Sequence, residues 1–163
     1  MLDIRHLSVS YAGDRPALSD FSLHMERGEV VALVGESGSG KTTAVRTVLG
    51  LLPPGGTVEG GRVTFEGHSL LGLSHKEWGR LRGKELSMIF QDSGAMLNPI
   101  RTVGSQFREY IRAHSVLSRQ EAAELSGEML ARMGLPNPES ILASYPFQLS
   151  GGQRQRVGIA MAM

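Results

Sequence analysis

Residues 30–43 read VVALVGESGSGKTT, and our prediction of the fold starts from this stretch. Residues 30–34 are all apolar, which is typical of a β-strand covered on both faces. Gly35, Gly40, Lys41 and Thr42 then fit the spacing G-x-x-x-x-G-K-[ST], which is that of the phosphate-binding P-loop. Glycines let backbone N–H groups turn toward an anion, and the next helix adds the positive end of its dipole. The stretch therefore predicts a strand, a phosphate-binding loop and a helix, in that order.

The side chains of this loop suit a nucleotide and its magnesium ion. Lys41 can reach the β- and γ-phosphates, and the hydroxyl of Thr42 can bind Mg²⁺. We expect the whole loop to bind the nucleotide through the residues Gly35, Glu36, Ser37, Gly38, Ser39, Gly40, Lys41, Thr42 and Thr43.

The composition excludes several other classes of protein. The 163 residues suit one domain, or a core with a small lobe. A formal net charge of +1 gives no electrostatic argument for nucleic-acid binding. The chain has no cysteine, and its five histidines lack metal-ligand spacing. No apolar run approaches the ~20 residues of a transmembrane helix, and the N-terminus lacks the apolar core of a signal peptide. Any association with a membrane is therefore expected to go through a partner.

The remaining pattern predicts strands first and helices later. Capping boxes are expected at Ser74 with Glu77 and at Ser118 with Glu121. The methionines of the helical part are interpreted as core packing, and residues 137–143 as a connector. Strands are expected over residues 3–11, 18–25, 61–70 and 86–90, and helices over 41–52, 74–81, 103–114, 118–133 and 151–163.

A second motif narrows the class of nucleotide-binding protein. Residues 149–156 read LSGGQRQR and resemble the signature motif of the ATP-binding-cassette (ABC) family, which pairs it with a P-loop. The resemblance covers the whole chain. Tyr11 matches the family's adenine-stacking aromatic residue. Gln91 matches the Q-loop glutamine, whose amide can contact Mg²⁺ and the attacking water.

Shorter segments resemble one branch of that family, the ATPase subunits of oligopeptide, dipeptide and nickel importers. One departure is Ser93-Gly94, where many peptide importers have a proline after the Gln-Asp pair. The choice between peptide cargo and metal or metal-chelate cargo therefore stays open. The segments that carry the resemblance are GLLP at 50–53, MIFQD at 88–92, LNP at 97–99 and YP at 145–146.

The resemblance implies an α/β fold. It consists of a P-loop NTPase with a RecA-like core and an antiparallel β subdomain, joined to the α-helical ABC subdomain. It divides the chain into a nucleotide-binding core over 1–97, a helical subdomain over 98–149, and the signature motif with its following helix over 150–163.

The resemblance also implies that the chain is C-terminally incomplete. The family places the Walker B strand, whose carboxylates hold Mg²⁺ and polarise water, after the signature helix. No apolar run ending in Asp-Glu occurs here, and hydrolysis requires such groups. We therefore assign no catalytic residue within this chain. Alone, the chain is expected to hydrolyse little ATP, and to be unstable, to pair with another copy, or to be part of a larger chain.

The signature residues are expected to form a second anion site. Ser150 is a natural N-cap, and Gly151 and Gly152 leave N–H groups free at a helix N-terminus. By resemblance, this half-site closes on the γ-phosphate of ATP held by the P-loop of another subunit. The expected contacts are Ser150, Gly151, Gly152 and Gln153. Arg154 and Arg156 are interpreted as serving the helix face and the nucleotide interface rather than as a basic patch.

The resemblance implies the motor ATPase of an importer of peptides, nickel or other metal chelates. The implied partners are a second ABC ATPase subunit, identical or different, and transmembrane permease subunits that face the helical residues after Gln91. An extracytoplasmic substrate-binding protein would act indirectly, and the expected location is the cytoplasmic face of the cell membrane. Two alternatives stay open: a soluble, non-transport ABC ATPase, and a non-hydrolysing nucleotide-binding module. Soluble members usually carry two cassettes or a coiled-coil insertion, and the sequence shows neither.

Overall fold

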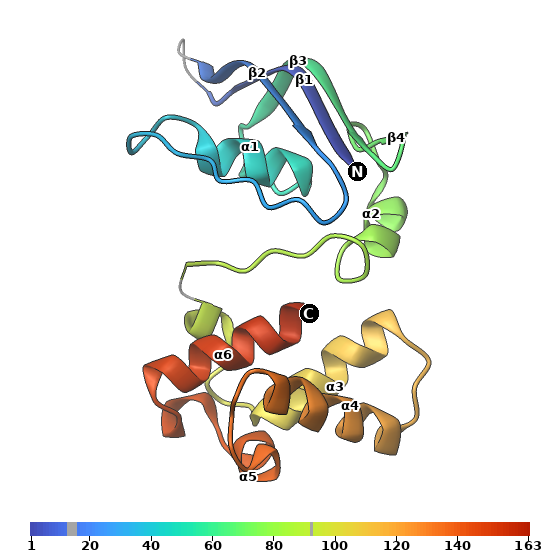
Figure 1. Ribbon diagram of the computed structural model, residues 1–163, viewed down its shortest axis with the longest axis vertical. Coiled ribbons are helices and arrows are strands. Elements are labelled where there is room, and N and C mark those ends of the chain that lie inside the picture. The colour runs from blue at the N-terminus through green and yellow to red at the C-terminus, as the bar shows by residue number, and fades with distance from the viewer. Residues whose placement is uncertain (13–15, 92) are drawn as a thin grey trace. The chain divides into compact units, whose positions relative to one another are not determined.

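The computed structural model describes residues 1–12, 16–91 and 93–163, which form two compact units (Figure 1). The first unit is Met1–Gly79 and the second is Arg80–Met163. The first is built on an antiparallel sheet with helices beside it, and the second mainly on helices.

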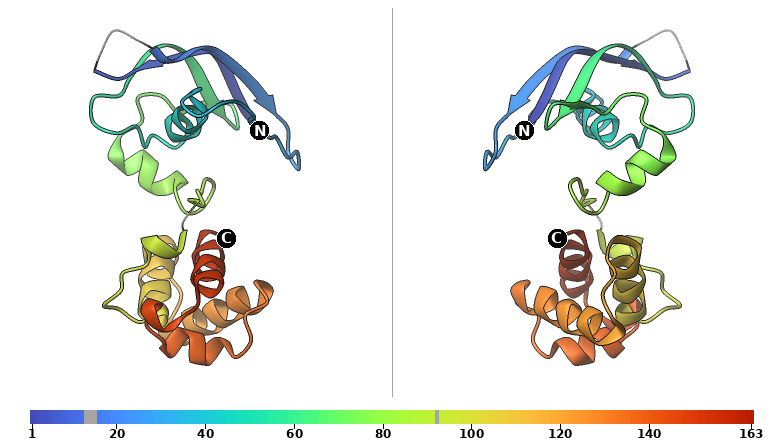
Figure 2. Two further views of the ribbon diagram at one scale, coloured as in Figure 1. Left: turned by 90° about the vertical axis from the view of Figure 1, so that its left-hand side faces the viewer. Right: turned by 90° about the vertical axis from the view of Figure 1, so that its right-hand side faces the viewer.

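The sheet of the first unit has four strands in the order β2-β1-β3-β4, and every neighbouring pair is antiparallel. Figure 2 shows the three long strands curving over helix α1. The first two predicted strands are confirmed, whereas the third begins four residues earlier than predicted and is interrupted at Glu66 and Gly67. The strands are β1 (Leu2–Ser10), β2 (Pro16–Met25), β3 (Thr57–Phe65) and β4 (His68–Ser69).

A β-bulge sets which side chains of the central strand β1 face the core. Ile4 and Leu7 are both buried although they are three residues apart, which strict alternation does not allow. The pairing of β1 with β2 shifts between these two residues, and His6 there has a φ of 50°. The extra residue of a bulge changes the phase of the alternation, so both apolar side chains reach the core.

Helix α1 (Lys41–Val48) packs against β2 and ends four residues before the predicted boundary. Gly50 has a φ of 59°. Its N–H donates to the carbonyl of Thr47, and the N–H of Leu51 donates to that of Arg46. This is the pattern of a Schellman C-cap, for which glycine is suited. The predicted extension to residue 52 is therefore wrong.

Two predicted buried strands are absent from the described chain. Residues 30–34 form no strand, and the side chains of Val30 and Val34 are 94% and 93% exposed. Residues 86–90 form only a single bridge, between Arg82 and Leu86. A parallel strand is stabilised by hydrogen bonds from its neighbours, and no described residue supplies such a ladder to either segment. The predicted strands over residues 30–34 and 86–90 are therefore wrong.

Helix α2 (His75–Leu81) follows the capping residue Ser74. The N–H of Ser74 donates to Oε2 of Glu77 at 2.7 Å, and the N–H of Glu77 lies 3.4 Å from Oγ of Ser74. The capping box predicted here is confirmed.

The helices of the second unit follow the sequence prediction closely. Ser118 and Glu121 form the predicted capping box at the start of α4. The predicted connector at 137–143 is instead a short helix, because Asn137 takes a left-handed conformation and Pro138 can begin a helix. The helices are α3 (Val103–His114), α4 (Arg119–Arg132), α5 (Pro138–Ala143) and α6 (Gly151–Ala162), with 3-10 turns η1 (Ser93–Met96) and η2 (Pro146–Gln148).

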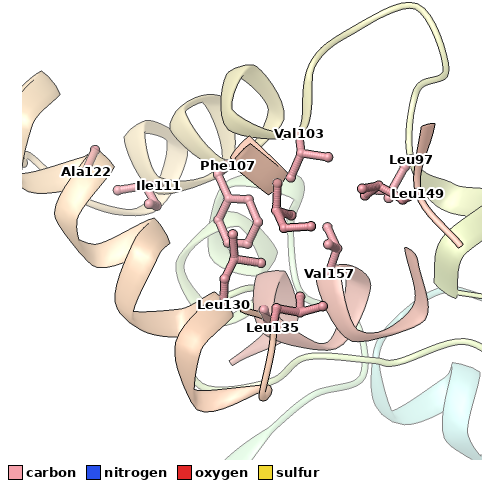
Figure 3. Packing of buried hydrophobic residues seen from close by; sticks show 11 residues of the cluster. Leu97, Val103, Phe107, Ile111, Ala122, Leu130, Leu135, Leu149 and Val157 are labelled. Atoms are coloured by element: carbon pink, nitrogen blue, oxygen red, sulfur yellow. The ribbon is translucent and has the colours of Figure 1, made fainter. Parts of the chain in front are cut away.

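A single apolar cluster holds these helices together (Figure 3). The ring of Phe107 on α3 points toward Leu130 on α4, and both side chains are buried. Met129, Met133 and Met161 pack against the cluster, as the packing interpretation of the methionines predicts. None of the helices in the described residues is long and apolar enough to cross a membrane.

Candidate nucleotide-binding site

The P-loop is a tight turn that leads directly into α1. The N–H of Ser39 donates to the carbonyl of Glu36 at 3.2 Å. Gly38 and Gly40 have φ values of 83° and 88°, and Gly40 is the N-cap of α1. These left-handed conformations suit glycine. The loop therefore brings backbone N–H groups and the positive end of the helix dipole to the same place.

Gly40 of the motif is required by a close contact as well as by its backbone angle, whereas the contact at Gly35 is weaker. A Cβ on Gly40 would lie 2.5 Å from the carbonyl oxygen of Ala17 on β2. A Cβ on Gly35 would lie 2.8 Å from Oγ of Ser39, which is a side-chain atom that can rotate away. The rigid contact at Gly40 thus fixes the start of α1 against the sheet.

The ammonium group of Lys41 lies over the mouth of the loop. Its Nζ donates to the carbonyl oxygens of Gly35 at 2.7 Å and Glu36 at 2.6 Å, and lies 3.2 Å from Oγ of Ser39. The side chain is therefore folded back across its own loop. A point charge with three donors in this position can exchange carbonyl oxygens for phosphate oxygens without moving far.

Tyr11 contacts the same loop from the end of β1. Its hydroxyl lies 3.3 Å from Oγ1 of Thr43, at the start of α1. Together with Ala17 and residues 37–43 it lines a hollow of about 380 Å³. Gly56 allows the ring of Tyr11 to pack closely against the backbone, because a Cβ on Gly56 would lie 2.9 Å from Cε1 of Tyr11. Sequence reasoning did not identify this contact. The only sequence signal at Gly56 is its membership of a Pro-Gly turn.

The hydroxyl of Thr42 is available for a metal ion. Thr42 is exposed, and none of the hydrogen bonds formed by the described residues uses its hydroxyl. A hydroxyl next to a phosphate-binding loop is a suitable oxygen ligand for Mg²⁺, which prefers few protein ligands and substrate phosphates. The described residues contain no group of three His, Cys, Asp or Glu side chains that could hold a metal ion by themselves.

The signature residues form the start of α6. Oγ of Ser150 lies 3.3 Å from the N–H of Gln153, and Oε1 of Gln153 accepts from the N–H of Ser150 at 2.8 Å. This capping box leaves Gly151 and Gly152 exposed at the helix N-terminus. Leu149 just before it is buried in the helical core. The exposed glycines are therefore presented to solvent from a well-anchored helix end.

The two arginines after the motif have structural partners. Nη1 of Arg154 donates to the carbonyl of Leu149 at 2.6 Å. Nη1 of Arg156 donates to the carbonyl of Gly134 at 2.9 Å, just beyond the end of α4. Both guanidinium groups thus satisfy backbone carbonyls next to helix ends, which supports the interpretation that they serve the helix face.

The family model described as ABC transporter matches residues 18–163. The chain belongs to the ABC transporter family. It is 41% identical to the oligopeptide transport ATP-binding protein OppD of Bacillus subtilis, covering 100% of this chain and 47% of that protein. It is 42% identical to the probable D,D-dipeptide transport ATP-binding protein DdpD of Escherichia coli, covering 99% of this chain and 51% of that protein. The chain thus spans about half the length of these curated relatives.

A solved ABC cassette has the same fold. The chain superposes on the ATP-binding cassette MJ0796, whose structure is a dimer in a post-hydrolysis state with ADP and Pi. The TM-score is 0.83 at 27% identity, over 100% of this chain and 69% of that one. The predicted fold class, a P-loop cassette with an antiparallel sheet and helices, is confirmed.

The ABC site residues fall in two groups. Tyr11 and the P-loop lie in the first unit, where the structure brings them together. Gln91 and the signature residues lie in the second unit, and Gln91 is exposed. Asp92, the second member of the quoted Gln-Asp pair, lies outside the described residues. A role for Gln91 next to Mg²⁺ stays a prediction.

Proposed function

We propose that this protein is the ATP-binding subunit of an ABC importer, and that it couples ATP binding and hydrolysis to uptake of peptides. The observation that carries the proposal is the position of the Lys41 ammonium group over the carbonyls of Gly35 and Glu36, beside the N-terminus of α1. That arrangement is suited to a triphosphate. The pairing of this loop with the signature motif supports a cassette ATPase over other P-loop proteins.

In this proposal the residues of the first unit hold the nucleotide. The N–H groups of residues 35–43 and Nζ of Lys41 bind the phosphates, and the ring of Tyr11 stacks on adenine. Thr42 supplies a hydroxyl ligand to Mg²⁺. By the family resemblance, we also propose a role at the metal or at the attacking water for the amide of Gln91, which lies in the second unit. Bound Mg²⁺ would neutralise charge on the phosphate oxygens.

The signature residues Ser150, Gly151, Gly152 and Gln153 would complete the site in trans. The exposed N-terminus of α6 has free N–H groups and no lysine of its own, so it suits an anion that is already held elsewhere. The solved relative MJ0796 is a dimer, which supports pairing of two cassettes. We propose a second ABC ATPase subunit, identical or different, as the partner.

The relatives support our proposals for the cargo, the membrane partners and the location. The proteins named above are described as oligopeptide and D,D-dipeptide transport ATP-binding proteins, which supports peptide cargo. None of those names supports the nickel alternative. We propose that transmembrane permease subunits hold the protein at the cytoplasmic face of the membrane, and that an extracytoplasmic binding protein acts through them.

We further propose that a polypeptide of residues 1–163 binds ATP without rapid turnover. These residues contain no apolar run followed by Asp-Glu, and hydrolysis needs an acidic group at the metal and the water. Phosphate release should stay at the rate of a sample that lacks protein. Mg²⁺-dependent release that disappears in Lys41→Ala would contradict this part of the proposal.

The decisive experiment is calorimetric titration of ATP and Mg²⁺ into the protein and two lysine variants. Lys41→Ala should weaken ATP binding by about tenfold to a hundredfold, since hydrogen bonds to charged groups contribute roughly 1.5–3 kcal/mol. Lys76→Ala removes an exposed lysine of α2 and should leave affinity unchanged. Equal affinity in the wild type and Lys41→Ala would overturn the assignment of the site.

A further inference from the structure

A second concave surface lies on the helical unit, apart from the predicted nucleotide contacts. It is a groove of about 940 Å³ lined by α3, the α3–α4 connection and the start of α4, whose positions Figure 1 shows. Four of its nine lining residues are arginines: Arg101, Arg108, Arg112 and Arg119. We call this surface the arginine groove.

The charge of the arginine groove is largely unbalanced. Arg108 and Arg112 are one helical turn apart, so they share a face of α3. Arg119 is the first residue of α4, where the helix dipole adds further positive potential. Glu109 is the only acid among the described lining residues, and it is paired with Arg101. Within the described chain, the other three arginines form no ion pair.

Such an arrangement costs stability unless a partner balances it. Like charges one turn apart on a helix repel each other, and a concave surface lined by one sign of charge concentrates the potential. Arg108 and Arg112 are not part of the apolar core, and they do not cap α3, because Thr102 is its N-cap residue. The groove therefore has the features of a binding surface rather than of a structural element.

The lining residues indicate the chemistry of the partner. Guanidinium groups bind carboxylates through two parallel hydrogen bonds. Ala113, Leu117 and Ala122 add apolar surface between the arginines. An extended or helical peptide that alternates acidic with apolar side chains would match both features. A flat membrane surface would not reach into a hollow.

We propose that the arginine groove binds an acidic segment of a partner polypeptide, with carboxylates on Arg108, Arg112 and Arg119. Binding there does not involve the P-loop, so it is independent of ATP. The inference goes beyond the proposed function, because it assigns a binding surface and a ligand class that the proposed function does not name.

The test uses a fluorescein-labelled peptide of alternating glutamate and leucine, its glutamine counterpart, and phosphatidylglycerol vesicles. Fluorescence anisotropy should show binding of the glutamate peptide only. The double variant Arg108→Gln, Arg112→Gln should weaken binding by about tenfold or more, because it removes two charge-assisted contacts. Glu109→Gln should tighten binding by roughly threefold, since it removes a competing carboxylate from the groove.

Matched controls separate this proposal from general charge effects and from the ATP site. Arg132→Gln removes an exposed arginine at the far end of α4 and should bind the peptide like the wild type. Lys41→Ala should also bind it normally, even if ATP binding fails. Three results would overturn the proposal. The first is that Arg132→Gln weakens peptide binding as much as the double variant does. The second is that the protein prefers the vesicles to the glutamate peptide, and the third is that a folded Glu109→Gln protein binds the peptide more weakly than the wild type.

Discussion

The hydroxyl of Tyr11 lies 3.3 Å from Oγ1 of Thr43, which joins the end of β1 to the first turn of α1 across 32 residues of sequence. Thr43 is buried and Tyr11 is half-buried. The ring is therefore held at the edge of the P-loop rather than left free on the surface. This is the placement that base stacking requires, since one face of the ring must stay accessible.

Substitutions at Tyr11 should separate stacking from the hydrogen bond to Thr43. Tyr11→Ala should weaken ATP binding by about tenfold, because stacking of a base on an aromatic ring contributes roughly 1–3 kcal/mol. Binding of inorganic triphosphate, which has no base, should not change. Tyr11→Phe should retain ATP affinity and lose about 1 kcal/mol of stability. If Tyr11→Ala weakened both ligands equally, the ring would have only a structural role.

Gly40 should tolerate no side chain. Gly40→Ala forces a Cβ to within 2.5 Å of the Ala17 carbonyl and onto a φ of 88°. Strained backbone of this kind costs about 1–3 kcal/mol, and the start of α1 should shift. Urea unfolding followed by circular dichroism measures the loss. Gly79→Ala in α2 is the control: its Cβ meets no atom within 4 Å, so helix propensity should make it neutral or stabilising by up to about 1 kcal/mol. Similar losses in both variants would contradict the contact.

The long helices α3, α4 and α6 could be predicted from the sequence, and the reason is local. The hydrogen bonds of an α-helix join residues four apart, and the capping signals lie next to the ends they fix. Ser118 and Ser150 each mark a helix start that the structure confirms. The P-loop and the signature motif are equally local, since each is a short run of consecutive residues whose identities alone indicate its role.

The two predicted buried strands failed because such strands depend on distant segments. Residues 30–34 have the composition of a buried strand, but composition does not supply the neighbouring strands that a parallel ladder needs. The contacts of Gly40 with Ala17 and of Tyr11 with Gly56 join segments far apart in the sequence. No periodicity or motif in the sequence predicts contacts between such distant residues. The residues that pack against the P-loop and Tyr11 are therefore identified only from the structure.

The capping box of α4 should make part of the stability depend on pH. Hydrogen bonds from Ser118 hold the pKa of Glu121 below its usual value of 4.5. A lowered pKa means that the carboxylate stabilises the folded state above its unfolded pKa, and that this contribution is lost as pH falls toward the folded pKa. The stability difference between wild type and Glu121→Gln should therefore be present at neutral pH and shrink below about pH 4.5.

The control for that comparison is Glu128→Gln, which changes an acid on the same helix outside the capping box. Its stability difference from the wild type should change little over the same range of pH. A Glu121→Gln difference that stayed constant down to acid pH would show that the carboxylate makes no special contribution at the cap.

Ser150 offers a way to separate helix capping from a role in a second subunit's ATP site. Ser150→Ala removes the acceptor for the N–H of Gln153 and should cost about 1 kcal/mol of stability. Ser150→Asp keeps a good capping acceptor, but it places a negative charge where a γ-phosphate would bind. We therefore expect the aspartate variant to unfold like the wild type and to bind ATP to its own P-loop. It should fail to form the ATP-dependent dimer in sedimentation velocity. A stable Ser150→Asp protein that dimerised with ATP as well as the wild type would exclude the signature residues from the trans site.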